Sequence, residues 1–151
     1  MGNKLSQRQL VAEIRPVGSN CGRKGPRFDG AFAQVTGGEL TAAVEKVYDG
    51  GSTFPDVLSA PAEIGDVTLT RHLDKERNDH RSLKRVRQLV GSARYDVYVY
   101  MLNCDLKENG TERVYPGALL VGLTEPEGDA ASGSPASFSL TFSISTVSAS
   151  V

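Results

Sequence analysis

The feature that most constrains the fold is an alternating segment near the end of the chain, residues 136–146. Its apolar residues, each separated from the next by serine or threonine, are Phe138, Leu140, Phe142 and Ile144. A period of two places the apolar side chains on one side of a β-strand and the hydroxyls on the other. A second uncharged strand is predicted from Val114 to Thr124. The pair predicts a sheet with a core face and a small, polar, uncharged face that is covered by something or lines something.

Further strands are predicted from hydrophobic periodicity and from the turn residues between them. They cover residues 10–17, 28–35, 40–48, 63–71 and 95–102. Residues 10–17 could also form a helical turn, and the spacing of Val44 and Val47 also fits a helix. The glycines around the third of these segments favour a hairpin between it and the second. The last segment is apolar or aromatic on both sides, which is typical of a central strand covered on both faces. Asn109 and Gly110 form the strongest hairpin signal and predict the turn into the strand that begins at Val114.

One helix is predicted, over about residues 78–90. Asp74 or Asn78 can cap it, and Gly91 ends it. Its apolar stripe is formed by Leu83, Val86 and Val90. At 151 residues the chain is most economically a single domain, residues 1–151. The fold class predicted is mainly β, an antiparallel sandwich or barrel of about six or seven strands with one flanking helix.

Residues 49–62 are predicted to form a long loop, because glycines and two prolines disfavour a packed helix or strand there. The loop nevertheless contains Phe54, Val57 and Leu58. A long loop with apolar side chains is usually functional, so a docking role is predicted for it.

Charge is distributed unevenly along the chain, although the net charge is only −1. Residues 71–94 hold eight basic and three acidic residues, net +5, and residues 95–151 hold two basic and seven acidic residues, net −5. The two blocks pair either within one molecule or between copies. The candidate contact residues are Arg81, Lys84 and Arg85 on the basic helix, and Glu125, Glu127 and Asp129 in the acidic Gly/Ser-rich connector, residues 125–135.

No catalytic, cofactor or metal constellation is predicted. His72 and His80 match no zinc spacing and are interpreted as solvated or capping residues. The acidic connector lacks the ligand count of a calcium loop, which favours a solvated turn over a cation site. Cys21 and Cys104 have no metal-ligand spacing, and a single disulfide between them is the weaker interpretation. No signal peptide or membrane-spanning run is found, so synthesis in a cytoplasm is expected.

These segments together resemble the major tail tube protein of long-tailed bacteriophages. The resemblance covers roughly residues 38–146 and rests on the sequences IGDVTLTR (64–71), RVYPGALL (113–120), TEPE (124–127) and FSLTF (138–142). It is a likeness of fold pattern, and residues 1–35 match nothing in it.

The resemblance implies a subunit of six-membered rings that stack into a tube around a channel for DNA, as in the type VI secretion tube protein. It implies that residues 49–62 reach an adjacent ring. It further implies tape measure, tail terminator and distal tail proteins as partners, and a place in the virion tail after assembly in the host cytoplasm. A head-to-tail ring requires two unlike, complementary surfaces, which the charged blocks can supply.

Two other interpretations stay open at this point. One is a small β-sandwich module that binds a carbohydrate or a protein, which predicts a stable monomer with an exposed aromatic platform. The other is a DNA-binding protein that uses the basic helix, with binding that weakens steeply with salt.

Overall fold

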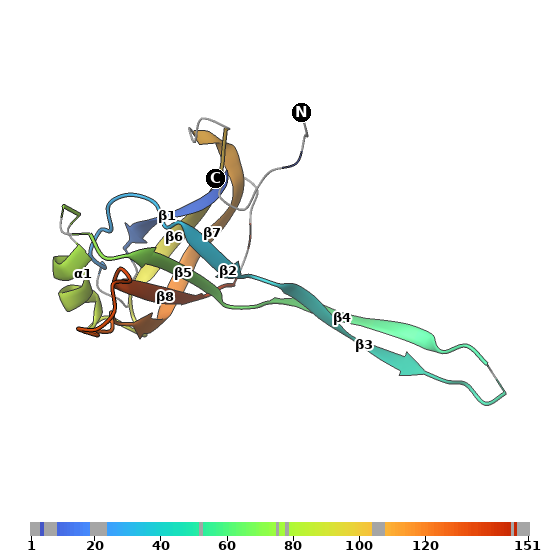
Figure 1. Cartoon of the computed structure of the whole chain (residues 1–151). Coiled ribbons are helices and arrows are strands. Elements are labelled where there is room, and N and C mark those ends of the chain that lie inside the picture. Colours follow the sequence, from blue (N-terminus) through green and yellow to red (C-terminus); the bar gives the residue numbers. More distant parts are fainter. Residues whose placement is uncertain are drawn as a thin grey trace.

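Antiparallel strands make up most of the fold, with one helix beside them (Figure 1). The computed structural model describes residues 4, 9–18, 24–51, 53–74, 76–77, 79–103, 108–145 and 147. Cys21, Asn78 and Cys104 lie outside the described residues. The elements are β1 (Leu10–Val17), β2 (Gln34–Gly37), β3 (Leu40–Val47), β4 (Asp56–Ile64), β5 (Val67–His72), α1 (Asp79–Val86), β6 (Arg94–Leu102), β7 (Glu108–Thr124) and β8 (Ser137–Ser143). The predicted fold class is confirmed.

Six of the strands form one curled sheet in the order β1-β6-β7-β8-β5-β2. Every neighbouring pair in it is antiparallel. The two outer strands approach each other because Phe32, just before β2, exchanges two backbone hydrogen bonds with Ala12 of β1, with N···O distances of 3.0 and 2.6 Å. The sheet therefore curls around a single interior.

The interior is filled by the alternating residues of the strands, as the period of two predicts. Phe138, Leu140 and Phe142 of β8 are each at most 1% exposed, and Val67 and Leu69 of β5 are fully buried. Segment 24–33, which lies before β2, adds Phe28 and Phe32 to this core. The rings of Phe28, Phe32 and Phe138 meet with centroids about 6 Å apart, within the range of favourable aromatic pairs.

The remaining two strands, β3 and β4, form a separate two-stranded ribbon, here called the arm. The arm extends away from the six-stranded sheet on the side opposite α1 (Figure 1). The prediction of a loop over residues 49–62 is therefore wrong for its second half, because β4 begins at Asp56. Pro61 is tolerated there because the pairing register shifts beside it and β4 has only one neighbouring strand.

The pairing predicted for the first half of the chain is also wrong. Residues 28–33 contribute only the Ala12–Phe32 bridge, and the strand begins at Gln34. That strand, β2, pairs with β5, while β3 pairs with β4. Two glycines with left-handed backbone, Gly37 and Gly38, separate β2 from β3 and send β3 out of the sheet.

Three smaller predictions also require correction. The helix ends at Val86, and Leu89 in the following turns is buried whereas Val90 is 38% exposed. Leu102 pairs with Glu108, so Asn109 and Gly110 lie in β7 and not at the turn. The central strand β6 is not covered on both faces along its whole length, because its second face is partly exposed at Asp96 and Tyr98, although Tyr100 on that face is buried.

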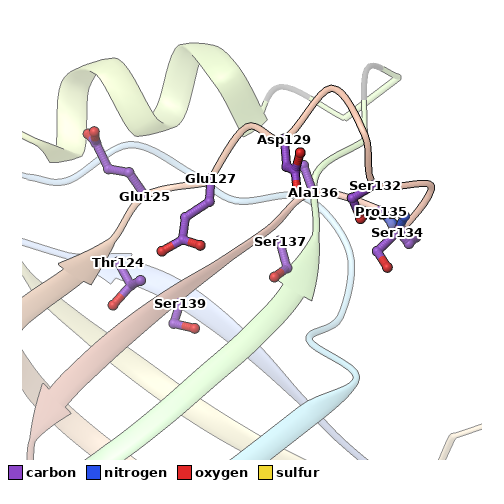
Figure 2. A pocket seen from close by; sticks show the side chains of 10 residues that line it. All are labelled: Thr124, Glu125, Glu127, Asp129, Ser132, Ser134, Pro135, Ala136, Ser137 and Ser139. Atoms are coloured by element: carbon purple, nitrogen blue, oxygen red, sulfur yellow. Dashed lines mark hydrogen bonds between the residues drawn. The ribbon is translucent and has the colours of Figure 1, made fainter.

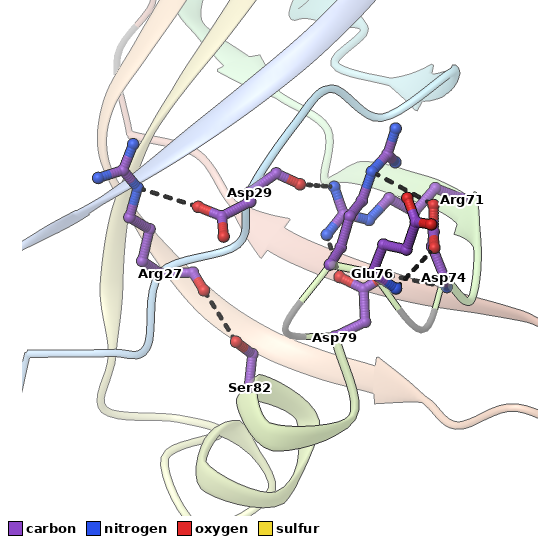
Figure 3. Close-up of polar contacts among 8 residues, drawn as sticks. Arg27, Asp29, Arg71, Asp74, Glu76, Asp79 and Ser82 are labelled. Carbon is purple, nitrogen blue, oxygen red and sulfur yellow. Dashed lines mark hydrogen bonds and ion pairs between the residues drawn. The ribbon is translucent and has the colours of Figure 1, made fainter.

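The helix is fixed to the sheet by polar contacts at its buried start (Figure 3). The guanidinium of Arg71, from β5, forms an ion pair with the carboxylate of Asp79, and both side chains are at most 2% exposed. Ser82 donates a hydrogen bond to the carbonyl of Arg27 at 2.8 Å. These contacts hold α1 against both the sheet and segment 24–29.

A further polar anchor is Tyr95 of β6, which is fully buried and donates a hydrogen bond to the carbonyl of Pro26 at 2.8 Å. Burial raises the pKa of the Tyr95 phenol. The stabilisation linked to this raised pKa is fully present below about pH 10, the unfolded value, and is lost as pH rises toward the folded value. We expect Tyr95→Phe to lower the free energy of unfolding by about 1–2 kcal/mol at pH 7.

The same variant should also show a shallower loss of stability above about pH 10 than the parent protein does. Urea unfolding followed at several pH values from neutral to alkaline measures both effects. An unchanged alkaline slope would contradict the assignment to Tyr95.

Candidate functional site

The arm exposes apolar side chains to an unusual extent. Phe54, beside its tip, is 83% exposed, and the predicted contact residues Val57 and Leu58 are 60% and 52% exposed. Further exposed apolar residues of the arm are Leu40, Val44, Val47 and Tyr48. Single exposed apolar residues are normal, but contiguous patches on soluble monomers usually mark an interaction site.

The pairing register gives the two faces of the arm different chemistry. On one face Leu40 lies beside Ile64, Ala42 beside Ala62 and Val44 beside Ser59. This apolar face also includes Val57, opposite Lys46.

The other face carries three carboxylates, Glu45, Asp56 and Glu63, and is called here the acidic face of the arm. It also contains Leu58, which pairs with Glu45. Val57 and Leu58 therefore point to opposite sides of the ribbon. Across residues 39–66 there are six acidic residues and one basic residue, Lys46, so the net charge of this segment is −5.

The basic helix presents its three candidate residues, Arg81, Lys84 and Arg85, to solvent. Arg81 and Arg85 are four residues apart and so lie on one side of α1. They line a hollow of about 300 Å³ together with Pro26, Arg27 and Ser82. We call the three arginines around this hollow, Arg27, Arg81 and Arg85, the basic groove. The hydrogen bond from Ser82 to the carbonyl of Arg27 holds segment 24–29 beside α1, which places Arg27 next to the arginines of the helix.

Within the part of the chain that the structure describes, no carboxylate forms an ion pair with Arg81 or Arg85. Arg27 is paired with Asp29 at 3.3 Å, and both side chains are substantially exposed. The groove therefore keeps an excess of positive charge that is not paired with a carboxylate among the described residues.

The acidic connector lies at the same end of the molecule as α1, where Figure 2 shows it beneath the helix. Glu125, Glu127 and Asp129 line an open hollow of about 340 Å³ with serine and threonine side chains. Glu125 also forms an ion pair with Arg87, the residue that follows the last residue of α1. The basic and acidic blocks are thus joined within one molecule by this pair. Among the described residues, no group of three His, Cys, Asp or Glu side chains is placed to hold a metal ion.

The uncharged face predicted for the sheet forms two rows of small polar residues across β2, β5, β8 and β7. Thr36, Thr68 and Thr141 are aligned in one row with Gly122. The second row contains Thr70 and Ser139, whose hydroxyl oxygens are 2.8 Å apart, and Thr124. Its members on β5 and β8 are partly exposed. Hydroxyls that bond to one another across strands leave a smooth surface without formal charge.

The structure thus separates the sequence-predicted contact residues into two groups. The helix and connector residues lie together at one end, and Phe54, Val57 and Leu58 lie on the arm at the other end (Figure 1). Sequence reasoning predicted a strand over residues 40–48 but did not include its apolar residues Leu40 and Val44 among the candidate contact residues. No helix in the described part of the chain has the length and apolarity needed to span a membrane.

No protein-family model and no curated protein sequence matches this chain. Solved structures do share its fold. A chain in the cryo-EM structure of the anti-feeding prophage baseplate, 6-fold symmetrised, superposes with a TM-score of 0.74 and 19% identity over 98% of this chain and 96% of that chain. A chain in the tube terminating cap of the same prophage gives 0.68 and 15%, over 98% and 91%. One in the sheath-tube complex of the extracellular contractile injection system PVC, in the extended state, gives 0.69 and 16%, over 96% and 90%. The chain therefore has the fold of proteins found in contractile injection particles.

Proposed function

We propose that this chain is a non-catalytic structural subunit that assembles with copies of itself into stacked rings, which form the tube of a tail-like injection particle. The observation that carries the proposal is the arm. A two-stranded ribbon is at best marginally stable in water without packing against something else. An arm with this much exposed apolar surface needs a partner.

A second copy of the chain is the partner that best fits the arm. The fold is shared with chains in a 6-fold symmetrised baseplate and in a sheath-tube complex. The arm and the bulk of the molecule lie at opposite ends, and an unlike pair of surfaces generates rings or stacks. The six-fold ring symmetry is part of the proposal.

The hydroxyl rows support a position for the sheet in this tube. We place the face that carries Thr68, Thr70, Ser139 and Thr141 toward the channel, because an uncharged wall holds passing cargo weakly. The proposed cargo is double-stranded DNA, as the resemblance to phage tail tubes implies. The fold neighbours favour a contractile particle, and the likeness to a chain in the tube terminating cap supports a tube terminator among the partners. A tape measure protein and a distal tail protein, and the location in a virion tail, rest on the phage resemblance alone.

The alternative of a sugar- or protein-binding module has less support. It requires an exposed aromatic platform. The exposed Tyr48 and Phe54 belong to the arm, and in the six-stranded sheet the candidates are Tyr98 and Tyr100, because their rings stack 7° from parallel. Tyr100 is only 8% exposed, so the pair offers a single accessible ring and not a platform.

The test is a variant in which Ala43 to Pro61 are replaced by Asn-Gly, so that the remaining strands still pair through Ala42 and Ala62. We expect the full-length protein to form rings or tubes, visible by negative-stain microscopy and light scattering. The shortened variant should remain a folded monomer at every concentration, because its core is intact and its docking surface is gone.

The matched control is Val121→Ser, which removes an exposed apolar side chain from β7, away from the arm. This variant should assemble like the parent. Full-length protein that stays monomeric at high concentration, or an arm-shortened variant that forms normal tubes, would overturn the proposal.

A further inference from the structure

We infer that the basic groove of one copy, Arg27, Arg81 and Arg85, is the receptor for the acidic face of the arm of the next copy. This inference rests on the proposed self-assembly and adds to it the surface that the arm contacts. The starting point is the balance of charge. The segment that forms the arm, residues 39–66, has a net charge of −5, and the segment that contains α1, residues 71–94, has a net charge of +5.

The two charged surfaces cannot satisfy each other within one molecule, because they lie at opposite ends of it (Figure 1). Exposed charges separated by much more than the Debye length, about 8 Å at physiological salt, are largely screened from each other. The complementarity has an effect only when two copies meet end to end. Such a contact is head-to-tail and can repeat without limit.

The basic groove is suited to receive carboxylates. Arg81 and Arg85 have no carboxylate partner among the described residues, and they converge with Arg27 on one hollow. Guanidinium groups present several donors in a plane and bind carboxylates through paired hydrogen bonds. Asp29 neutralises only one of the three arginines.

The acidic face of the arm is suited to enter such a groove. Glu45 and Asp56 lie on adjacent strands, and Glu63 lies nearer the base on the same face. All three side chains are exposed. With the carboxylates turned toward the groove, the apolar face of the arm points the other way and is free to pack on a further surface of the assembly. One ribbon can therefore make both a charged contact, which sets partner choice and register, and an apolar contact, which supplies affinity.

The experiment uses charge reversal and rescue in the full-length protein. The first variant is R81E/R85E and the second is E45K/E63K. Each should raise the concentration needed for tube formation about tenfold or more, because like charges then face each other in the contact. A chain with all four changes should assemble again, since the pairing is restored with reversed sign. Tube formation by the parent protein should weaken as salt is raised, because salt screens the contact. Tube formation by the four-fold variant should weaken with salt in the same way.

The matched control is Lys84→Glu, an equal change of charge per residue on the same helix at a position that does not line the groove. It should leave the concentration for tube formation within about twofold of the parent value, which is the spread expected for a surface substitution outside the contact. All the altered side chains are exposed, so every variant should fold like the parent. Circular dichroism on each variant checks this.

Two outcomes overturn the inference. One is an R81E/R85E variant that forms tubes as readily as the parent protein does. If that variant has lost salt-sensitive binding to duplex DNA instead, the groove binds nucleic acid and not the arm. The other is a folded four-fold variant that does not assemble. In either outcome the proposed function still stands if shortening the arm abolishes tubes. Parent protein that never assembles defeats the proposed function instead.

Discussion

Replacing Asp79 with alanine should lower the free energy of unfolding by about 3–5 kcal/mol, the usual loss when one partner of a buried ion pair is removed. A small domain of this kind has only about 5–15 kcal/mol in total. The variant should therefore be largely unfolded in mild denaturant. Urea unfolding monitored by circular dichroism gives the value directly.

The size of the effect follows from what surrounds the partner, Arg71. Its guanidinium lies 4.5 Å from the centroid of the Phe32 ring, and the rings of Phe28 and Phe138 are within 6 Å. Burial lowers the pKa of Arg71, and the Asp79 carboxylate opposes that shift. An arginine stays charged inside a protein even so. Without Asp79, a full positive charge would remain among aromatic rings, and among the described residues only the carbonyl of Asp29 would accept a hydrogen bond from it (Figure 3).

The chain provides its own control for this prediction. Arg77 and Asp74 form an ion pair at 3.8 Å whose side chains are 40% and 45% exposed. Removing it by Arg77→Ala should cost less than about 1 kcal/mol, because exposed pairs are weak. A double variant, R71M/D79L, should recover much of the stability lost in Asp79→Ala, since apolar side chains of similar size suit the site. Equal losses for Asp79→Ala and Arg77→Ala would contradict the burial argument.

The parts of the fold that the sequence predicted well are those whose pattern is set by burial on one side. The alternation of β8 predicted that Phe138, Leu140 and Phe142 are buried, and the same holds for Val67 and Leu69 of β5. Those patterns are local, and the core imposes them on each strand separately. The helix was predicted for the same reason, with an error at its end where Leu89 replaces Val90.

A strand over residues 40–48 was predicted, but the second strand of the arm and its pairing with the first were missed, because most side chains of the arm are exposed. A ribbon exposed on both faces shows no clean alternation, and Pro61 together with nearby glycines indicated a loop. Strand order was unpredictable for another reason. β2 pairs with β5, although both strands of the arm lie between them in the sequence. The basic groove joins Arg27 to Arg81 through a fold contact, so spacing along the sequence could suggest a shared patch but not the hollow. The ion pair between Arg71 and Asp79 could not be predicted, because nothing in the sequence distinguishes these two residues from the other charged residues near the helix.

The direction of the arm depends on a close contact at its base, and this makes Gly37 the residue whose replacement should most affect assembly. Gly37 ends β2 with φ +88°, a left-handed conformation that favours glycine. A Cβ added there would overlap the backbone carbonyl oxygen of Asp66. Asp66 precedes β5 and accepts a hydrogen bond from the amide of Gly38 at 3.1 Å. At this point both connections leave the six-stranded sheet for the arm.

We expect Gly37→Ala to destabilise the protein by about 3 kcal/mol, combining a strained left-handed residue with a backbone displacement. Because the displaced backbone is the base of the arm, the variant should also fail to form tubes under conditions in which it is still folded. The control is Gly50→Ala near the tip of the arm, where a Cβ would meet no atom within 4 Å and the backbone is not left-handed. That substitution should change stability by less than about 0.5 kcal/mol and leave assembly intact. If Gly37→Ala formed normal tubes while losing stability, the base of the arm would tolerate rotation, and the arm would have to find its partner by flexibility and not by a fixed direction.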